Sequence, residues 1–463
     1  MKNKLTSINL SRRDFLKIAG GAAAITAGAS MMPNYLRKVL LPEQAVEAQT
    51  GYDLYYAGTD GWIYLPPTPA IFLPGTQTAI HPDPLGPAPL NTYIFGFRNV
   101  SGMTDAQRID QKQKAQHNAP LFWVNQFDPG NPVDFRVQVT NLGLALRPDL
   151  FDAHTLHWHG FRNVIPFFDG EPSSSVAVPT GENFTYIYRP REEGTYMFHC
   201  HVEDVEHVHM GMTGLVFVRP LQNGNTSHYP SGKYAYNDGD GTTGYDREFA
   251  MFLSEVWAES HWSDAHIQLP EWSDYKVDFA LVNGRVYPDT LAPNAPINAA
   301  ASIHALAVQT DATGDLVAPP GRPELKYQPH SSLVTCQPGE RVLLRFANLG
   351  FTESAMTLAG IQMRVVGRDA TMLRGRDGTN TSYETDTISI SAGESYDVIF
   401  TAPAFSGGSG STGQGYDSYL LYNRAYAHAN NLASGGFGGQ ATEIHVYPNG
   451  SLAAQQYPND WGI

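Results

Sequence analysis

Alternating apolar and polar residues recur through the chain and constrain its fold more than any other feature. The segment PVDFRVQVTN (132–141) places Phe135, Val137 and Val139 on one face, with polar residues between them. This period of two is typical of a β-strand with one buried face. GERVLLRFAN (339–348) repeats the arrangement and also ends in Asn. We therefore expect an all-β fold, which the 44 glycines and 32 prolines also favour as turn residues.

The strand patterns fall into two similar blocks. The first spans 52–221 and the second 246–450, with a polar, Gly-rich segment over 222–245 between them. Each block contains a turn followed by a strand that ends in Asn. We interpret the blocks as two Greek-key β-sandwich domains of related design, joined by a linker over 222–245. The chain is long enough for each domain to enclose a core of its own.

The N-terminus has the pattern of an export signal. Arg12 and Arg13 precede the small and apolar run IAGGAAAITAGASMM (18–32). Paired arginines before such a run are typical of twin-arginine signals. The run is too short and too rich in Gly and Ala for a membrane-spanning helix. We predict a signal segment over 1–48, cleaved after VEA, and a periplasmic or other extracytoplasmic location. An uncleaved membrane anchor is the alternative.

Charge and cysteine content exclude several classes of protein. The formal net charge of −15, with no basic run outside the N-terminus, argues against nucleic acid as a partner. Two cysteines in 463 residues cannot form a disulfide framework. Cys336 has no potential metal ligand beside it, so we predict an ordinary buried thiol there. Cys200 differs, because a histidine stands on each side of it.

The segment GTYMFHCHVEDVEHVHMGM (194–212) contains that second cysteine. If the segment begins as a strand, His199 and His201 point to one face and Cys200 points to the other. One short strand can then serve two sites, one inside its own sandwich and one on the outer face. A loop through VEDVE could return a histidine and a methionine to the same sulfur.

A second stretch, DAHTLHWHGF (152–161), supplies further histidines. His157 and His159 share a face, whereas His154 comes where the strand begins and can turn inward. The inward set combines two imidazoles, a thiolate and a weak thioether, which is the ligand set of a blue-copper site. Zinc prefers four strong ligands, and methionine is a poor one. The inward set consists of His154, Cys200, His207 and Met212.

The outward set offers four imidazoles from two neighbouring strands, and imidazole also suits copper. Because the backbone joins Cys200 to its two neighbours, an electron at the inner site has a short covalent route to the outer one. His209 and Met210 are nearby rivals for the inner ligand roles. The outward set consists of His157, His159, His199 and His201.

Together these motifs resemble the multicopper oxidases, in particular the laccase-like group. HTLHWHG, FFDGEP and GTYMFHCHVEDVEHVHMGMTGLVFV carry the resemblance in the first block, and LVNGRVYPDT and LLRFANLG carry it in the second. The resemblance implies two cupredoxin domains, with a blue copper at the inward set and a trinuclear copper cluster at the outward set. It also implies a proton-relay role for Asp169. A turn aspartate before Gly170 is the alternative for that residue.

The sequence departs from the laccase pattern in two ways. His207 follows Cys200 by seven residues, a longer spacing than in typical laccases, which indicates an insertion in the loop. A trinuclear cluster also needs histidines from two facing domains, yet the second block contains no His-x-His. We expect its isolated histidines to have surface or capping roles: His261, His266, His304, His330, His428 and His445.

The outer site could be completed in three ways. Two chains could face each other around a twofold axis, a separate partner could supply the missing half, or the site could bind fewer coppers. The last arrangement resembles the copper nitrite reductases, which have an Asp where this chain has His157 and a catalytic histidine in the second domain. His428 is the nearest candidate for that histidine.

The favoured hypothesis is a copper-dependent oxidoreductase that oxidises a small-molecule or metal-ion reductant and reduces dioxygen. A periplasmic blue-copper electron carrier or copper-binding protein is the non-enzymatic alternative.

Overall fold

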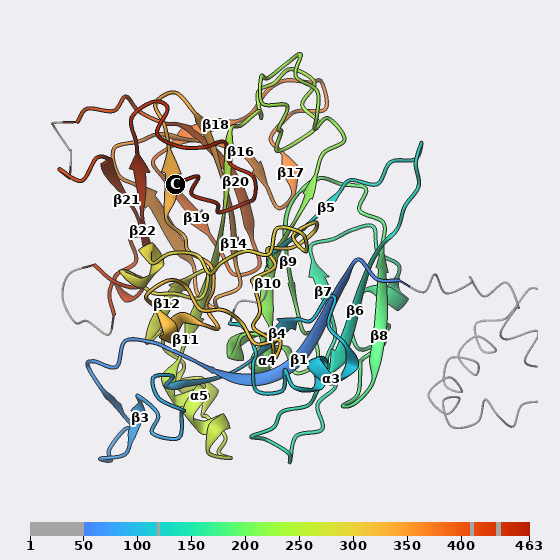
Figure 1. The fold of residues 1–463 in the computed structure, drawn as a ribbon, viewed down its shortest axis with the longest axis vertical. Helices are drawn as coiled ribbons and strands as arrows, with labels where there is room; N and C mark the ends of the chain where they lie inside the picture. The colour runs from blue at the N-terminus through green and yellow to red at the C-terminus, as the bar shows by residue number, and fades with distance from the viewer. Residues whose placement is uncertain (1–50, 118–120, 408–411, 432–436) are drawn as a thin grey trace, which may run out of the picture. The chain divides into compact units, whose positions relative to one another are not determined.

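Stacked β-sheets contain most of the regular secondary structure in a computed structural model, which describes residues 51–117, 121–407, 412–431 and 437–463 (Figure 1). The fold is all-β, as the alternation predicts. The segment 1–48, predicted to be a signal, lies outside the described residues. Within them, no helix is both long enough and apolar enough to cross a membrane.

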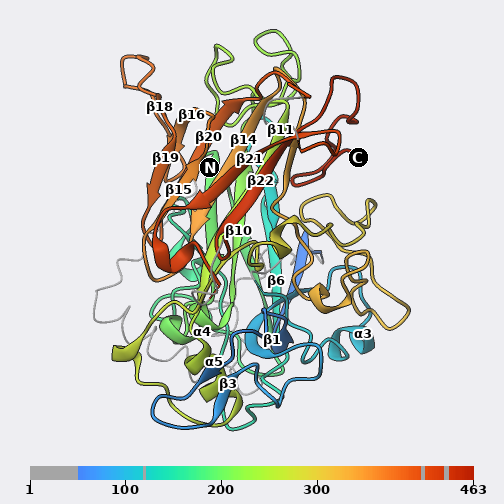
Figure 2. The ribbon, with the colours of Figure 1, turned by 90° about the vertical axis from the view of Figure 1, so that its left-hand side faces the viewer.

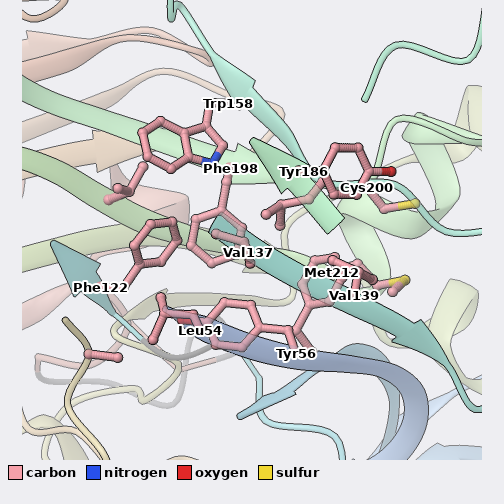
Figure 3. Close-up of a cluster of buried hydrophobic side chains, with 14 of the residues drawn as sticks. Leu54, Tyr56, Phe122, Val137, Val139, Trp158, Tyr186, Phe198, Cys200 and Met212 are labelled. Carbon is pink, nitrogen blue, oxygen red and sulfur yellow. The ribbon is translucent and has the colours of Figure 1, made fainter. Parts of the chain in front are cut away.

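The first domain is a sandwich of two four-stranded sheets whose aromatic and aliphatic side chains meet in one core (Figure 3). The residues that alternate in the sequence, Phe135, Val137 and Val139, are all buried in that core. One sheet has the order β4 (Thr92–Asn99), β1 (Leu54–Ile63), β6 (Phe135–Asn141) and β8 (Asn183–Tyr188). The other has the order β5 (Phe122–Asn125), β10 (Thr213–Arg219), β9 (Gly194–His199) and β7 (His157–His159).

The second domain is built in the same way, with a core of its own between two sheets (Figure 2). One sheet contains β12 (Phe279–Val282), β11 (Arg247–Val256), β14 (Arg341–Asn348), β20 (Ser395–Thr401), β16 (Met363–Arg368) and β17 (Thr371–Met372), and β18 (Tyr383–Thr385) pairs with β16. The other has the order β13 (Val334–Cys336), β22 (Ala441–Val446), β21 (Asp417–Asn423), β15 (Ser354–Leu358) and β19 (Thr387–Ile390).

Short elements fill the connections between strands. A two-stranded sheet pairs β2 (Ile71–Phe72) with β3 (Ala79–His81). The α-helices in the described part of the chain are α3 (Asp105–Ile109), α4 (Asp204–Met210) and α5 (Ala258–Ala265). Single 3₁₀ turns are η2 (Pro166–Phe168), η3 (Trp272–Asp274), η4 (Asp289–Leu291), η5 (Pro323–Leu325) and η6 (Tyr426–His428).

The Asn that ends a strand in each block has the same structural role. The side-chain amide of Asn141 donates to the carbonyls of Asp152 and Val178 over 2.8 and 2.9 Å. That of Asn348 donates to the carbonyls of Thr352 and Ile390 over 3.0 Å each, so each amide joins the loop that follows to a more distant segment. Each side-chain oxygen accepts from a glycine amide two residues later, at Gly143 and Gly350. The repeated motif therefore fixes the loop that leads into β7 in the first domain and into β15 in the second.

A buried chain of charges joins the two domains. Arg345 on β14 lies 3.2 Å from the carboxylate of Asp397 and 3.1 Å from that of Glu248, and Glu248 also pairs with Arg219 on β10. Thr195 on β9 donates to Asp397 over 2.6 Å. Burial raises the pKa of Glu248, but attraction to the two guanidinium groups outweighs it and lowers the pKa to about 2. The connection 222–245 adds to this contact, because Ala235, Tyr236 and Tyr245 pack into a small core with β14 and β20.

Candidate metal centre

Three of the four inward residues converge in the core of the first domain. Cys200 directly follows β9, and its Sγ lies 3.2 Å from Nδ1 of His207 and 4.0 Å from Nδ1 of His154. All three side chains are fully buried. The backbone amide of Thr155 donates to the sulfur over 3.4 Å. Paired backbone hydrogen bonds to Val178 hold the backbone of His154 and so fix the position from which its side chain extends.

His207 reaches the sulfur from a helix, where the sequence predicted a loop. Helix α4 follows Glu203, which has a left-handed φ of +46°, and ends at Gly211, whose φ is +114°. Acidic residues in the first turn and a glycine after the last turn favour such a helix. The residues that lengthen the spacing from Cys200 to His207 therefore form a helical turn rather than extended chain. The loop prediction was wrong here.

Met212 shares a pocket with His154 over a glycine of β1. A Cβ on Gly58 would lie 2.5 Å from Cδ2 of His154 and 3.2 Å from Cε of Met212, so only glycine leaves room for both side chains. The amide of Cys200 donates to the carbonyl of Met212 over 3.0 Å. Figure 3 shows the sulfur atoms of Cys200 and Met212 at the same end of the core. The thioether thus stands beside the thiol and the two imidazoles.

The electrostatics of the pocket favour a thiolate. Burial raises the pKa of the Cys200 thiol, but the imidazoles of His207 and His154 outweigh it and lower the pKa well below the usual range. Burial likewise lowers the pKa of His207, while Cys200 and Asp152 raise it to about 10. The thiolate is the form of cysteine that binds metal ions. Two imidazoles, a thiolate and a thioether in a closed pocket fit copper better than zinc.

Sequence reasoning missed two residues of this pocket. Asp152 lies with its carboxylate 3.4 Å from Nε2 of His207, on the side away from the sulfur. Such a contact fixes which ring nitrogen faces the metal position. Gly58 is the second missed residue. The sequence signal that could have found it is a glycine inside a strand, which often marks the close approach of another group.

The rival ligands point elsewhere. Nε2 of His209 accepts from the amide of Trp257 over 3.2 Å, and its ring packs against His261 and Tyr275 with centroids 5.0 and 5.6 Å away. Met210 is buried in the hydrophobic core of the first domain. Of the two histidines on α4, only His207 is bonded to the cysteine.

The four outward histidines also form one group. β7 and β9 pair so that His157 lies opposite His199, with ring centroids 5.2 Å apart. The ring of His201 is 5.0 Å from that of His157, and the ring of His159 is 5.6 Å from that of His199. His157, His159 and His199 each place a ring nitrogen within 4.8 Å of the others, close enough to share a metal ion.

Hydrogen bonds orient two of these rings. Nδ1 of His199 donates to the carbonyl of Cys200 over 2.8 Å, and Nδ1 of His157 donates to the carbonyl of Asp169 over 2.8 Å. Each bond leaves Nε2 as the nitrogen available to a metal. The Asp169 carboxylate lies 3.3 Å from the same His157 nitrogen. Asp169 also precedes Gly170, where a Cβ would lie 2.4 Å from a backbone carbonyl. The residue is therefore both part of a turn and a neighbour of the outward group.

The second domain repeats the hydrogen bonds around Cys200 with other side chains. The amide of Cys200 donates to the carbonyl of Met212, and the amide of Asn423 donates to the carbonyl of Gln440 over 2.9 Å. The amide of Ala355 donates to Oδ1 of Asn423 over 3.1 Å, just as a backbone amide donates to the Cys200 sulfur. The inner positions of the second domain therefore hold Ser354, Asn423, His428 and Gln440.

The polar groups of these residues form hydrogen bonds with one another and with neighbouring side chains, so they do not form a metal pocket. The hydroxyl of Ser354 and the amide of Asn423 donate to Oε1 of Gln440 over 3.0 and 2.8 Å. Nε2 of His428 lies 2.9 Å from the buried carboxylate of Glu255. Leu253 occupies the position on β11 that Gly58 occupies on β1, since the carbonyl of each accepts a hydrogen bond from the residue after the Asn that ends β14 or β6. His428 thus contacts the carboxylate of Glu255 and belongs to no candidate metal-binding group in the described residues.

The outer positions of the second domain hold no imidazole. In the register of β15 and β21, Thr357 lies opposite Tyr422, as His157 lies opposite His199 in the first domain. The corresponding residues are Thr357, Ala359, Tyr422 and Arg424. The second block contains no His-x-His, and this register places no imidazole at its outer positions, so the outward group lies in the first domain.

Several isolated histidines are buried, contrary to the expectation of surface or capping roles. His261, His330, His428 and His445 are each less than a tenth exposed. Nδ1 of His261, for example, lies 2.6 Å from a carbonyl of β4. The prediction for Cys336 is confirmed: it is buried, and burial raises the pKa of its thiol to about 12.

The fold and the two histidine groups define a two-domain cupredoxin protein with a candidate copper centre in its first domain. Two family models, each described as multicopper oxidase, match residues 105–223 and 277–408, together more than half of the chain. The chain belongs to the multicopper oxidase family.

Curated relatives agree with that assignment. The chain is 27% identical over 276 residues to laccase-7 of Oryza sativa subsp. japonica, covering 57% of this chain and 38% of the relative. It is 25% identical over 296 residues to copper resistance protein A of Pseudomonas syringae pv. tomato, covering 57% and 40%. The chain thus spans about two fifths of the length of these relatives. A blue copper oxidase from Nitrosomonas europaea has a similar fold, with a TM-score of 0.50 and 19% identity over 85% of each chain.

Proposed function

We propose that this protein is a copper-dependent oxidoreductase that takes single electrons from a reductant and passes them to dioxygen. The observation that carries the proposal is the position of Cys200 between two histidine groups. Its sulfur contacts His154 and His207, and its carbonyl accepts a hydrogen bond from His199. An electron at the sulfur therefore reaches the outward group through a few covalent bonds or one hydrogen bond.

The inward set would hold a blue copper, which supplies a one-electron redox centre when bound. The protein's own residues prepare for it. Burial excludes water from Cys200, Asp152 holds His207 in the orientation that faces the sulfur, and Gly58 leaves room for the thioether. The residues that would bind are His154, Cys200, His207 and Met212.

The outward set would hold further copper, where dioxygen is reduced. One chain supplies only half of a trinuclear site, because the second domain has no imidazole at the equivalent positions. We propose that a second copy of this chain completes the site through a twofold contact. Ile165 and Phe167, both more than half exposed, flank the turn at Asp169 and provide apolar surface for that contact. The residues that would bind are His157, His159, His199 and His201.

Asp169 would hold and move protons at the outward site. Its carboxylate lies beside His157 and is partly exposed, so it has contact with both the histidine group and solvent. Reduction of dioxygen to water consumes protons, and a carboxylate at this position could deliver them.

A second candidate function rests on the three-imidazole group. His157, His159 and His199 come from one chain and suit a single metal ion with an open position, as in catalytic sites. Such a site would favour a nitrite-reductase-like enzyme. If the outward group binds no metal, the protein would act as a blue-copper electron carrier.

Copper per chain, measured together with mass in solution, tests these functions. A dimer with about five coppers per two chains, and turnover with dioxygen, is the expected result. About two coppers per chain with nitrite turnover would favour the second candidate, and about one copper without turnover would favour a carrier. About four coppers per chain, in a complex with another protein, would mean that a separate partner completes the cluster.

The location of the protein is part of the proposal. We propose that the twin-arginine motif directs export and that residues 1–48 are removed. N-terminal sequencing of the protein from the periplasmic fraction tests this, and the mature chain should begin near Gln49. Replacing Arg12 and Arg13 with lysine should retain the protein in the cytoplasm, whereas unchanged export would contradict the assignment.

A further inference from the structure

A groove of about 660 Å³ lies on the outer face of the first domain, beside α3 (Figure 1). Gln138 and Thr140 on β6 line it, whereas Val137 and Val139 on the same strand lie in the hydrophobic core. Successive side chains of a strand point to opposite sides. The groove therefore lies on the face of the sheet that is turned away from the Cys200 pocket, and none of its lining residues belongs to a candidate metal-binding group of the described chain.

Polar groups in the groove keep hydrogen-bonding capacity that the protein does not use. Nε2 of Gln138 donates to Oδ1 of Asn183 over 3.0 Å, and neither side-chain amide has another partner within the described residues. Oε1 of Gln138 can therefore accept from a ligand, and Nδ2 of Asn183 can donate to one. The hydroxyl of Thr180, in the same groove, also has no protein partner among the described residues. This combination matches a ligand rich in hydroxyl groups, because each hydroxyl both donates and accepts.

An aromatic ring borders the same space. Tyr52 is 36% exposed, and its ring meets that of Tyr55 edge to face, with centroids 4.8 Å apart. The guanidinium of Arg108 lies 4.7 Å from the centre of the Tyr55 ring and covers that ring. Tyr52 therefore provides the ring that a ligand can contact. A tyrosine ring offers apolar surface beside a polar tip, which suits a sugar ring, with its C–H face and its hydroxyl groups.

The groove also contains a positive charge that no carboxylate of the described residues neutralises. Arg108 is paired with Asp105, whereas Lys112 forms no ion pair there. A Cβ on Gly143 would lie 3.8 Å from Oγ1 of Thr180 and 3.9 Å from Nζ of Lys112, so the hydroxyl and the ammonium border the same part of the groove. The net charge of −15 acts weakly on a ligand there, because the Debye length is about 10 Å at 0.1 M salt. A carboxylate in the groove would thus be attracted to Lys112.

Other classes of ligand fit the groove less well. A peptide that adds a strand needs an open sheet edge, whereas β6 is paired on both sides, with β1 and β8. An acyl chain needs a mostly apolar lining, and Ile109 and Leu142 are the only aliphatic residues in the walls of this groove. A nucleic acid, with a phosphate at every nucleotide, would need more than one unpaired basic residue.

We propose that this groove binds a short chain of uronic acid residues and so holds the protein on a carboxylated polysaccharide. One sugar ring lies against Tyr52, the hydroxyl groups bond with Gln138, Asn183 and Thr180, and a carboxylate pairs with Lys112. Binding breaks and forms no covalent bond and needs no metal ion. The proposal therefore stands or falls independently of the oxidoreductase function proposed above.

Calorimetry with the unmodified protein and its lysine variants tests the charge contact. The probes are trigalacturonate, its neutral methyl ester and the monomer galacturonate, and trigalacturonate should bind most tightly. Lys112→Gln should weaken trigalacturonate binding about three- to fivefold and change that of the ester less than about twofold. Lys114→Gln is the matched control, because it removes the same charge outside the groove wall. No saturable binding by the unmodified protein, or equal trigalacturonate affinity in the two variants, would overturn the proposal. Equal affinity for galacturonate and trigalacturonate would exclude a chain as the ligand.

Asn183→Ala tests the recognition of hydroxyl groups. It should weaken the binding of trigalacturonate and of the ester alike, about two- to tenfold, because both carry the hydroxyl groups that Asn183 would bond. Asn449→Ala changes an exposed side chain of the second domain and should leave both affinities unchanged. Affinities of the Asn183 variant equal to those of the Asn449 variant would contradict the hydroxyl contacts.

Footprinting locates the ligand without any substitution. An amine-reactive reagent modifies accessible lysines of the unmodified protein, and mass spectrometry measures the rate at each one. Saturating trigalacturonate should slow the modification of Lys112 and leave that of Lys114 unchanged. An unchanged rate at Lys112 under saturating trigalacturonate would place the bound chain outside the groove and would contradict the proposal.

Discussion

Nδ1 of His207 lies 3.2 Å from Sγ of Cys200, although a helix begins in the seven-residue interval between them. The contact exists because α4 turns its first buried histidine back toward the end of β9. It makes the cysteine part of a donor set rather than a core thiol. Cys336 shows the contrast, since it is equally buried but belongs to no candidate metal-binding group in the described residues.

Gly58 should be essential for the shape of this pocket. Gly58→Ala adds a Cβ 2.5 Å from His154, so one side chain must move. We expect about 1–3 kcal/mol of destabilisation and a shifted or weakened visible band, measured by urea unfolding and absorption. Gly51→Ala is the control, since nothing lies within 4 Å of its added Cβ. Equal stability and spectra for the two variants would contradict the close packing over Gly58.

Asp152 should strengthen copper binding without touching the metal. Asp152→Asn removes the carboxylate that holds Nε2 of His207. Loss of such a partner lowers metal affinity by about 10- to 100-fold. Competition with a copper chelator measures the change. Asp149→Asn is a suitable control, because Asp149 pairs with Arg147 instead of a candidate ligand. If both variants retain copper equally, Asp152 has no role in the site.

Glu248 should make the domain contact acid-sensitive. Its pKa falls from the ordinary 4.5 to about 2 in the folded protein, so its contribution to stability is complete above pH 4.5 and is lost as the pH falls toward 2. Glu248→Gln should destabilise the protein by about 3 kcal/mol at pH 7 and flatten the decline in stability below pH 4.5. Urea unfolding at several pH values measures both effects. Glu394→Gln, which disrupts a partly exposed pair with Arg368, should cost at most about 1 kcal/mol. A Glu248 variant with the acid profile of the unmodified protein would contradict the assignment.

His428 should be structural. It pairs with the buried Glu255, so His428→Gln should destabilise the protein by about 3 kcal/mol while copper per chain stays unchanged. His157→Gln, in the outward group, should lower copper per chain. Elemental analysis of both variants decides between the roles. Loss of copper on replacing His428 would instead support a nitrite-reductase-like site that includes a residue of the second domain.

The sequence predicted those features that depend on local pattern. Alternation located β6 and β14, and the spacing of histidines around Cys200 indicated which side chains could share a face. Helix α4 was missed because its start depends on a left-handed Glu203 and its end on Gly211, neither of which changes the apolar pattern. The burial of His261 and His428 was missed because their partners lie 168 and 173 residues away in the sequence. Gly58 could not be assigned to the site from the sequence, because His154 and Met212 pack over it only in the folded chain.

The most direct test of the account is the visible spectrum of the copper-loaded protein and of its Cys200→Ser variant. We predict an intense copper–thiolate band in the unmodified protein and none in the variant, because Cys200 is the one thiol that belongs to a histidine-containing donor group in the described residues. Cys336→Ser should leave the band unchanged. A band that persists without Cys200, or a copper-loaded protein that is colourless from the outset, would contradict the central claim.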